Sequence, residues 1–319
     1  MVDAESLLAG ARRPLVVGVG GGGDVVGALT VAEPLARLHG ARPVVGGTTW
    51  ERLVVDPHAG PRGLDEVAGI EEDLGPDAAL AGPATRVFQS GVRFAEARVA
   101  ELTREPTLLL DPTGGPDAVA QGLGTALERL EGDAVVLVDV GGDALAHGHE
   151  AGLSSPLCDA VLLAGGAELA ERGATVLGAI FGPGCDGELE PEEVLERLAE
   201  IAAAGGLAGA RLLAAPTAEV LERAVGHVPT EASAQPLRCL RGETGVTKIR
   251  GGRRQVTLSP LGALTFFFDV PVALASAARL ARAVRGAASL EAANDVLHAL
   301  GVRTELDLER ERLAASPGS

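Results

Sequence analysis

A repeated pattern in the first 190 residues constrains the fold of this chain more than any other feature. It consists of a short apolar run, then glycine with aspartate, then a stretch of helical character. Four runs end in this way, at residues 14–19, 107–110, 134–138 and 175–181. Strands that alternate with helices are typical of a mostly parallel sheet with helices on both faces. We therefore predict an α/β fold with glycine-rich loops at the carboxyl ends of its strands.

A further strand is expected near residues 44–50, ending at Trp50. The intervening helices are expected at residues 24–39, 118–130 and 156–172. Ser155 stands where the N-cap of the last of these helices would be, with proline at the first helical position.

The sequence changes character after Pro191, where helical patterns dominate to about residue 242. The later segments are predicted as a hairpin around Gly251 and Gly252, a strand at 264–268, and helices at 272–284 and 289–300. No segment is rich enough in Pro, Gly and Ser to act as a linker. We predict one domain over residues 1–319, with a Rossmann-like core (1–190) and a helical and hairpin extension (191–319) packed on it.

The charge of the chain argues against a nucleic-acid partner. Its 44 acidic and 27 basic residues give a net charge of −17, whereas binding to nucleic acid requires a basic face. The three cysteines are widely spaced, which disfavours a disulfide framework. No secretory leader is recognisable, and no uninterrupted run of roughly 20 apolar residues suits a bilayer. We expect a cytoplasmic protein that does not bind membranes.

The glycine-rich loops are the strongest candidates for a binding site. Ligands of open parallel sheets bind beyond the carboxyl ends of the strands. Glycine lets the backbone approach a ligand, and exposed N–H groups at helix starts attract anions. Any one loop alone is more typical of a capped helix than of a binding site, but four at one edge favour a site. The predicted substrate-binding residues in these loops are Gly21, Gly22, Gly23, Thr113, Gly114, Gly115, Gly141, Gly142 and Asp186.

Two nucleotide-binding motifs were compared with the first loop. Gly18, Gly20 and Gly23 match the spacing of the dinucleotide fingerprint, although a run of glycines matches many patterns. The acidic residue expected at the end of the second strand is absent, and Asp24 would face a pyrophosphate. No loop continues as Gly-Lys-Ser/Thr, which excludes a P-loop.

A short polar segment follows the second expected strand. Trp50 and Glu51 are predicted substrate-binding residues, and Trp50 is a candidate for stacking on a ring. Arg52 or Arg62 is a candidate for binding a carboxylate or phosphate. The alternative interpretation is that Trp50 covers the end of the sheet and Arg52 pairs with a nearby carboxylate.

Carboxylates in these loops suit catalysis or metal binding. Asp24 and Asp143 are predicted either to coordinate a divalent cation such as magnesium or, with Glu150, to act as acid and base. His147 and His149 lie near Asp143, but their spacing is not a standard metal motif, so solvated histidines are favoured. Cys185 is expected to be a buried thiol.

Several motifs, taken in order, resemble an uncharacterised family, domain of unknown function eleven fifty-two, which is mainly archaeal with actinobacterial members. The motifs are GVGGGGDVVGA, GGTTWERLVVDPHAGPRG, DVGGDALAHGHEAGLSSPLCDA, FGPGCDGEL, TEAS, SLEAAND and TELD. The resemblance spans nearly the whole chain and implies a single domain, but no activity. The segment DPTGGPDAVA is also similar to loops of glutamate-cyclase-like proteins, which implies a hold on an amino-acid carboxylate.

The sequence favours an enzyme of small-molecule metabolism that acts on a phosphorylated or carboxylated substrate, such as a nucleotide or a sugar phosphate. Two alternatives stay open: a lyase, cyclase or dehydratase that acts on a carboxylate without a metal, and a non-catalytic module that senses a nucleotide or metabolite. The expected partner is a small anionic ligand, and self-association into a homo-oligomer is left open.

Overall fold

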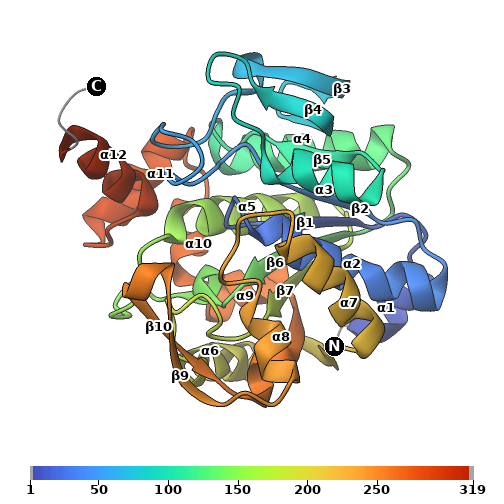
Figure 1. Cartoon of the computed structure of the whole chain (residues 1–319), viewed down its shortest axis with the longest axis vertical. Coiled ribbons are helices and arrows are strands. Elements are labelled where there is room, and N and C mark those ends of the chain that lie inside the picture. The colour runs from blue at the N-terminus through green and yellow to red at the C-terminus, as the bar shows by residue number, and fades with distance from the viewer. Residues whose placement is uncertain (1–2, 316–319) are drawn as a thin grey trace.

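A nine-stranded mixed sheet covered by helices on both faces forms the body of the protein (Figure 1). A computed structural model describes residues 3–315. The strand order is β3-β4-β5-β2-β1-β6-β7-β11-β8. In chain order the strands are β1 (Leu15–Gly18), β2 (Val44–Thr48), β3 (Val67–Gly75), β4 (Ala78–Val87), β5 (Thr107–Leu110), β6 (Val135–Val140), β7 (Val176–Phe181), β8 (Leu207–Leu212) and β11 (Leu264–Asp269).

Five strands, β5-β2-β1-β6-β7, form the parallel centre of the sheet. Leu15 of β1 pairs with Val44 of β2 on one side and with Val135 of β6 on the other. Both faces of β1 are buried, so its run is apolar throughout rather than alternating. The carboxyl ends of these five strands share one edge, as the sequence predicts. The strand order reverses between β1 and β6, which makes their ends the topological switch point of the sheet.

Antiparallel strands complete the sheet at both sides. The hairpin β3–β4, which the sequence did not reveal, pairs with β5. At the other side β11 runs antiparallel between β7 and β8. Because β8 and β11 come from the segment expected to be an extension, that segment is part of the central sheet. The predicted hairpin is present as β9 (Gly245–Ile249) and β10 (Arg254–Leu258), joined at Arg250–Gly252.

The helices form two layers on opposite faces of the sheet (Figure 1). On one face lie α1 (Ala4–Gly10), α2 (Asp24–His39), α3 (Ala95–Thr103), α7 (Ala215–Val225) and α8 (Gln235–Leu240). On the other lie α4 (Gly115–Arg129), α5 (Pro156–Glu171), α6 (Pro191–Ala203), α9 (Val270–Ser276), α10 (Arg279–Val284), α11 (Leu290–Ala299) and α12 (Glu305–Ala315). The single helix expected at 272–284 is interrupted and forms α9 and α10.

Helix α5 is buried on nearly all sides, because α4, α9, α10 and α11 enclose it against the sheet. The sequence predicted that Ser155 caps the start of this helix, but another residue provides the cap. Ser155 makes no capping bond from its side chain. Instead the carboxylate of Glu305, at the start of α12, accepts the backbone N–H groups of Leu157 and Cys158, both at 2.9 Å. A residue nearly 150 positions away therefore caps this helix.

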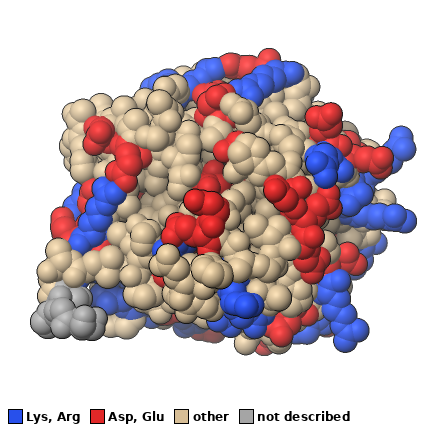
Figure 2. All heavy atoms as spheres, turned by 90° about the horizontal axis from the view of Figure 1, so that it is seen from above, with Lys and Arg blue, Asp and Glu red and all other residues tan. Residues whose placement is uncertain are grey.

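Acidic and basic side chains of the described residues are interspersed on the face of the molecule shown in Figure 2. Within residues 3–315, none of the helices combines the length and apolarity needed to cross a membrane.

The distant cap leads to a stability prediction. Glu305→Ala leaves two buried N–H groups without partners, so we expect the free energy of unfolding to fall by about 1–3 kcal/mol. Urea unfolding followed by circular dichroism measures the change. Glu311→Ala, on the exposed side of the same helix, is the matched control and should change stability by no more than about 0.5 kcal/mol. Equal effects of the two substitutions would contradict the capping role.

Candidate functional site

Three carboxyl groups from three elements meet at the switch point. Asp24 is the first residue of α2, Asp139 is the next-to-last residue of β6, and Asp159 lies in the first turn of α5. Their ligand oxygens all lie within 4.8 Å of one another. Asp139 and Asp159 are buried, whereas Asp24 is half-buried and connects the group to solvent. We call these three residues the first carboxylate group.

The hydrogen bonds of this group leave oxygens unused. Asp24 accepts the Gly20 N–H at 2.9 Å, and one oxygen of Asp139 accepts the Ala144 N–H at 3.0 Å. The other oxygen of Asp139 and Oδ1 of Asp159 are buried without a hydrogen-bond partner in the part of the chain that the structure describes. Buried polar atoms without partners are rare because each costs free energy. Two of them in one group make it a candidate binding site.

A second carboxylate group adjoins the first. It consists of Asp143, Asp186 and Glu188, whose ligand oxygens also lie within 4.8 Å of one another. Glu188 is fully occupied, since it accepts the N–H groups of Ser154 and Ser155 and lies 2.6 Å from Arg254. Within residues 3–315, neither carboxylate oxygen of Asp186 has a hydrogen-bond partner, although the residue is only 4% exposed.

The glycines of the loops make room for these carboxylates. A methyl group at Gly20 would lie 2.7 Å from Oδ2 of Asp24 and 3.3 Å from Oδ1 of Asp159. A methyl group at Gly141, whose φ is +129°, would overlap the carboxylate of Asp186. The sequence predicted glycines that open the backbone to a ligand. At these two positions they bring the protein's own carboxylates together.

Burial raises the pKa of every carboxyl group in this region except Glu188. It raises the pKa of Asp24 to about 6 against the opposing charge of Arg52, and that of Asp186 to about 7. The pKa values of Asp139, Asp143 and Asp159 lie well above the usual range, because burial is reinforced by neighbouring carboxylates. For Glu188, Arg254 and the surrounding hydrogen bonds outweigh burial, so its pKa is lowered.

Arginines surround the two groups. Arg52 donates to the Gly20 carbonyl, and its second terminal nitrogen lies 3.8 Å from Glu305. That nitrogen makes no hydrogen bond within residues 3–315. Arg254 reaches in from β10, and Arg250 stands at the hairpin tip with a positive φ of 52°. The positive charge of Arg250 contributes to lowering the pKa of both Asp24 and Asp186 against the larger effect of burial.

Trp50, Glu51 and Arg62, which the sequence places after β2, make contacts within the protein. The Trp50 ring is fully buried, its indole N–H donates to Glu309 at 3.1 Å, and Arg52 lies 5.5 Å from its centre. In this arrangement no ring of a ligand can stack on it. Glu51 accepts the Ala95 N–H at the start of α3, and burial raises its pKa to about 7. Arg62 pairs with Asp56 at 2.8 Å and with Glu66 at 3.0 Å.

The loop after β5 lies two strands from β1 in the sheet. Thr113 is bound by the side chain of Asp111, and a methyl group at Gly115 would press against residues 287–289. Gly114 is exposed beside them. No contact found among residues 3–315 brings this loop to Asp24.

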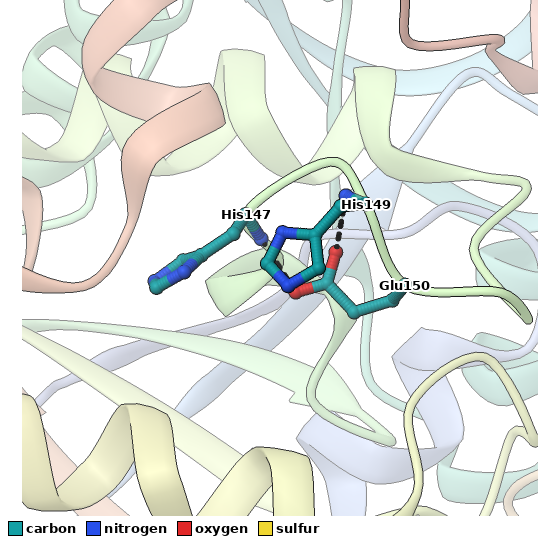
Figure 3. A group of neighbouring side chains, drawn as sticks. All are labelled: His147, His149 and Glu150. Carbon is teal, nitrogen blue, oxygen red and sulfur yellow. Dashed lines mark hydrogen bonds between the residues drawn. The ribbon is translucent and has the colours of Figure 1, made fainter.

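Glu150 lies in a separate cluster with the two histidines. Its oxygens accept the backbone N–H groups of His147, Gly148 and His149 at 2.8–3.0 Å, and Arg197 donates to it at 3.1 Å. Figure 3 shows the Glu150 carboxylate bonded to the backbone of the loop that carries both histidines, and one ring nitrogen of each histidine lies within 4.8 Å of it. Glu150 thus shapes the loop that follows Asp143.

Asp139 and Asp159 of the candidate site were not among the residues predicted from the sequence. Each interrupts an otherwise apolar segment, VVLVDV for the strand and CDAVLLAGG for the helix. A carboxylate inside a segment that must be buried needs a partner or a function. That signal was available in the sequence. The roles of Glu188 and Arg254 depend on how the loops pack, so the sequence alone could not predict them.

Comparison with known proteins identifies the family. The family model described as "Protein of unknown function (DUF1152)" matches residues 15–313. The chain belongs to the DUF1152 family. The match covers the sheet and both carboxylate groups. Neither the curated proteins nor the solved structures contain a match to this DUF1152 chain.

The packing of Asp186 on Gly141 can be tested by a matched pair of glycine variants. Gly209→Ala places a side chain at a similar φ of +139° with nothing within 4 Å, and backbone strain should cost about 1–2 kcal/mol. Gly141→Ala should cost at least about 1 kcal/mol more, because of the overlap. Adding Asp186→Ala should recover that excess in a denaturant titration. Equal losses at the two glycines would refute the predicted overlap.

The raised pKa values predict how stability depends on pH. The folded-state pKa values of Asp24 and Asp186, about 6 and 7, exceed the unfolded value near 3.9. The folded protein therefore binds more protons between about pH 4 and 7, and stability falls as the pH rises through that range. The lowered pKa of His147 acts in the opposite direction.

In cation-free buffer we expect the Tm to fall by about 5 °C between about pH 5.5 and 8, because each kcal/mol corresponds to roughly 2–4 °C. Differential scanning calorimetry measures the fall. Asp186→Asn should reduce the slope, whereas Asp295→Asn, an exposed residue of α11, should leave it unchanged. A Tm that rises over this range would show that the carboxylates are ionised without penalty.

Proposed function

We propose that this DUF1152 protein is a cytoplasmic enzyme that uses a divalent cation to act on a small phosphorylated metabolite, such as a nucleotide or a sugar phosphate. One observation carries the proposal. Asp24, Asp139 and Asp159 bring carboxylate oxygens within 4.8 Å of one another at the switch point, and two of these residues have a buried oxygen without a partner. Sets of oxygen ligands of this kind suit Mg²⁺ and Mn²⁺.

Charge balance explains why a cation belongs with an anionic substrate. The two groups hold six carboxyl groups, and three arginines, Arg52, Arg250 and Arg254, approach them. Once these carboxyl groups ionise, an anion alone would meet a region with excess negative charge, which opposes binding. A divalent cation offsets that excess and presents a positive ligand to a phosphate. Arg52, with an unused donor next to the Gly20 loop, is placed to contact the same phosphate.

A metal-free reaction is the second candidate, and the pKa values favour it. Asp24 and Asp186, with pKa values of about 6 and 7, are suited to proton transfer at neutral pH. Such a pair would serve a lyase, cyclase or dehydratase that acts on a carboxylate. The two candidates differ in their response to chelation.

The test begins with purified protein dialysed against a chelator and then titrated with Mn²⁺ by calorimetry. We expect saturable binding, and we expect Asp159→Asn to weaken it at least about 10-fold, since even changes beyond the metal ligands cost about 10–100-fold. Asp295→Asn is the control for general acidity.

The same samples are then incubated with a panel of nucleotides and sugar phosphates, with and without Mn²⁺, and products are read by mass spectrometry. Product that appears only with the cation supports the proposal. Equal turnover after chelation would favour the metal-free reaction. A ligand that binds and is never converted would indicate a sensing module.

A further inference from the structure

We propose that the second carboxylate group, Asp143, Asp186 and Glu188, holds a second divalent cation beside the first, so that the site is a two-cation centre for a phosphate group. This inference rests on the proposed function and deepens it. The key residue is Asp186, which is 4% exposed and has two carboxylate oxygens without hydrogen-bond partners. An arginine-paired carboxylate would use both oxygens, as Glu188 does in the same group.

The position of Arg254 shows that Asp186 is left for another partner. The guanidinium lies 2.6 Å from Glu188 but 3.8 Å from Asp186, and it donates to the Asp186 backbone carbonyl instead of the carboxylate. It also donates to the Ser154 hydroxyl. Arg254 therefore holds Glu188 and the backbone at Asp186 in place. The lone pairs of the Asp186 carboxylate stay available to a ligand.

The two groups are continuous with each other. Asp139 and Asp143 belong to one short segment at the end of β6, one in each group. Asp143 interacts electrostatically with Asp159 and Asp139 of the first group as well as with Asp186 of its own. Asp139, in turn, interacts with both Asp24 and Asp186. Cations held by the two groups would therefore be neighbours that share the carboxylates of this segment.

Glycine packing keeps this arrangement compact. Gly141 lies between Asp139 and Asp143 in the chain, and the Asp186 carboxylate rests against its backbone. The Gly184 N–H donates to the Gly141 carbonyl at 2.7 Å and so ties the Asp186 loop to the end of β6. Cation pairs about 3.5–4 Å apart clamp the oxygens of a phosphate group from two sides. A phosphate ester or anhydride is thus the ligand class that fits.

The experiment measures Mn²⁺ bound to the full chain by equilibrium dialysis and records the electron paramagnetic resonance spectrum of the loaded protein. We expect two Mn²⁺ per chain with a spectrum of two spin-coupled ions. Asp186→Asn should remove one ion and the coupling, and Asp159→Asn should also remove one ion and the coupling. Asp295→Asn should keep both.

The outcomes separate this inference from the proposed function. A single Mn²⁺ in the unsubstituted protein, two uncoupled ions, or an Asp186→Asn protein that still binds a coupled pair would overturn the second site while the first cation stands. No bound Mn²⁺ at all would overturn both. If Asp186→Asn does not fold, the stoichiometry and the coupling in the unsubstituted protein decide alone.

Discussion

Buried like charge at the switch point is the constraint on which the rest of this structure depends. Asp24, Asp139 and Asp159 are held together by α2, β6 and α5, and none of them is neutralised by a hydrogen-bonded arginine. Ionised carboxylates taken out of water without partners are costly. The surrounding fold must therefore be rigid enough to keep them in contact.

The rigidity comes from a buried helix and a distant carboxylate. Helix α5 lies in a layer between the sheet and α9–α11, and this packing fixes the position of Asp159 relative to the sheet. Glu305 caps that helix and also lies 3.8 Å from Arg52, which in turn bonds the Gly20 loop. Glu309, one turn further along α12, accepts the indole N–H of Trp50. The C-terminal helix thus connects the start of α5, the end of β2 and the first glycine loop. A chain shortened before α12 would lose all three contacts.

The sequence predicted the parallel centre of the sheet well, because strands buried on both faces are mostly apolar runs, and all but β2 of the five lead into a glycine-rich loop. It was less informative where geometry depends on distant contacts. The β3–β4 hairpin contains EEDLG and polar residues on an exposed edge, so it lacks the apolar run of a central strand. Capping by Glu305 could not be read from local sequence, since Ser155 satisfied every local rule for a cap.

The candidate site shows the same contrast between what local sequence predicts and what depends on distant contacts. The sequence predicted that Asp24, Asp143 and Asp186 lie at the carboxyl ends of the strands, where the structure has them, because each stands beside glycine. It did not distinguish carboxylates that serve the fold from those left unused. Glu150 and Asp186 look alike in sequence, each acidic and in a glycine-containing loop. Only the structure shows that Glu150 accepts three backbone N–H groups while the carboxylate of Asp186 accepts none.

What separates the two possible chemistries at this edge is competition between protons and cations for the same oxygens. Without a cation, burial keeps protons on these carboxyl groups near neutral pH, and a proton-transfer site results. A divalent cation binds only the ionised form, so it must displace those protons and lowers each pKa as it does so. The glycines at positions 20 and 141 favour the second state, because they allow carboxylates to converge more closely than proton transfer requires. Proton transfer needs one carboxyl group near a substrate. Two adjoining sets of three carboxylates, in which Asp139, Asp159 and Asp186 have buried oxygens without partners within residues 3–315, instead support the proposed binding of cations.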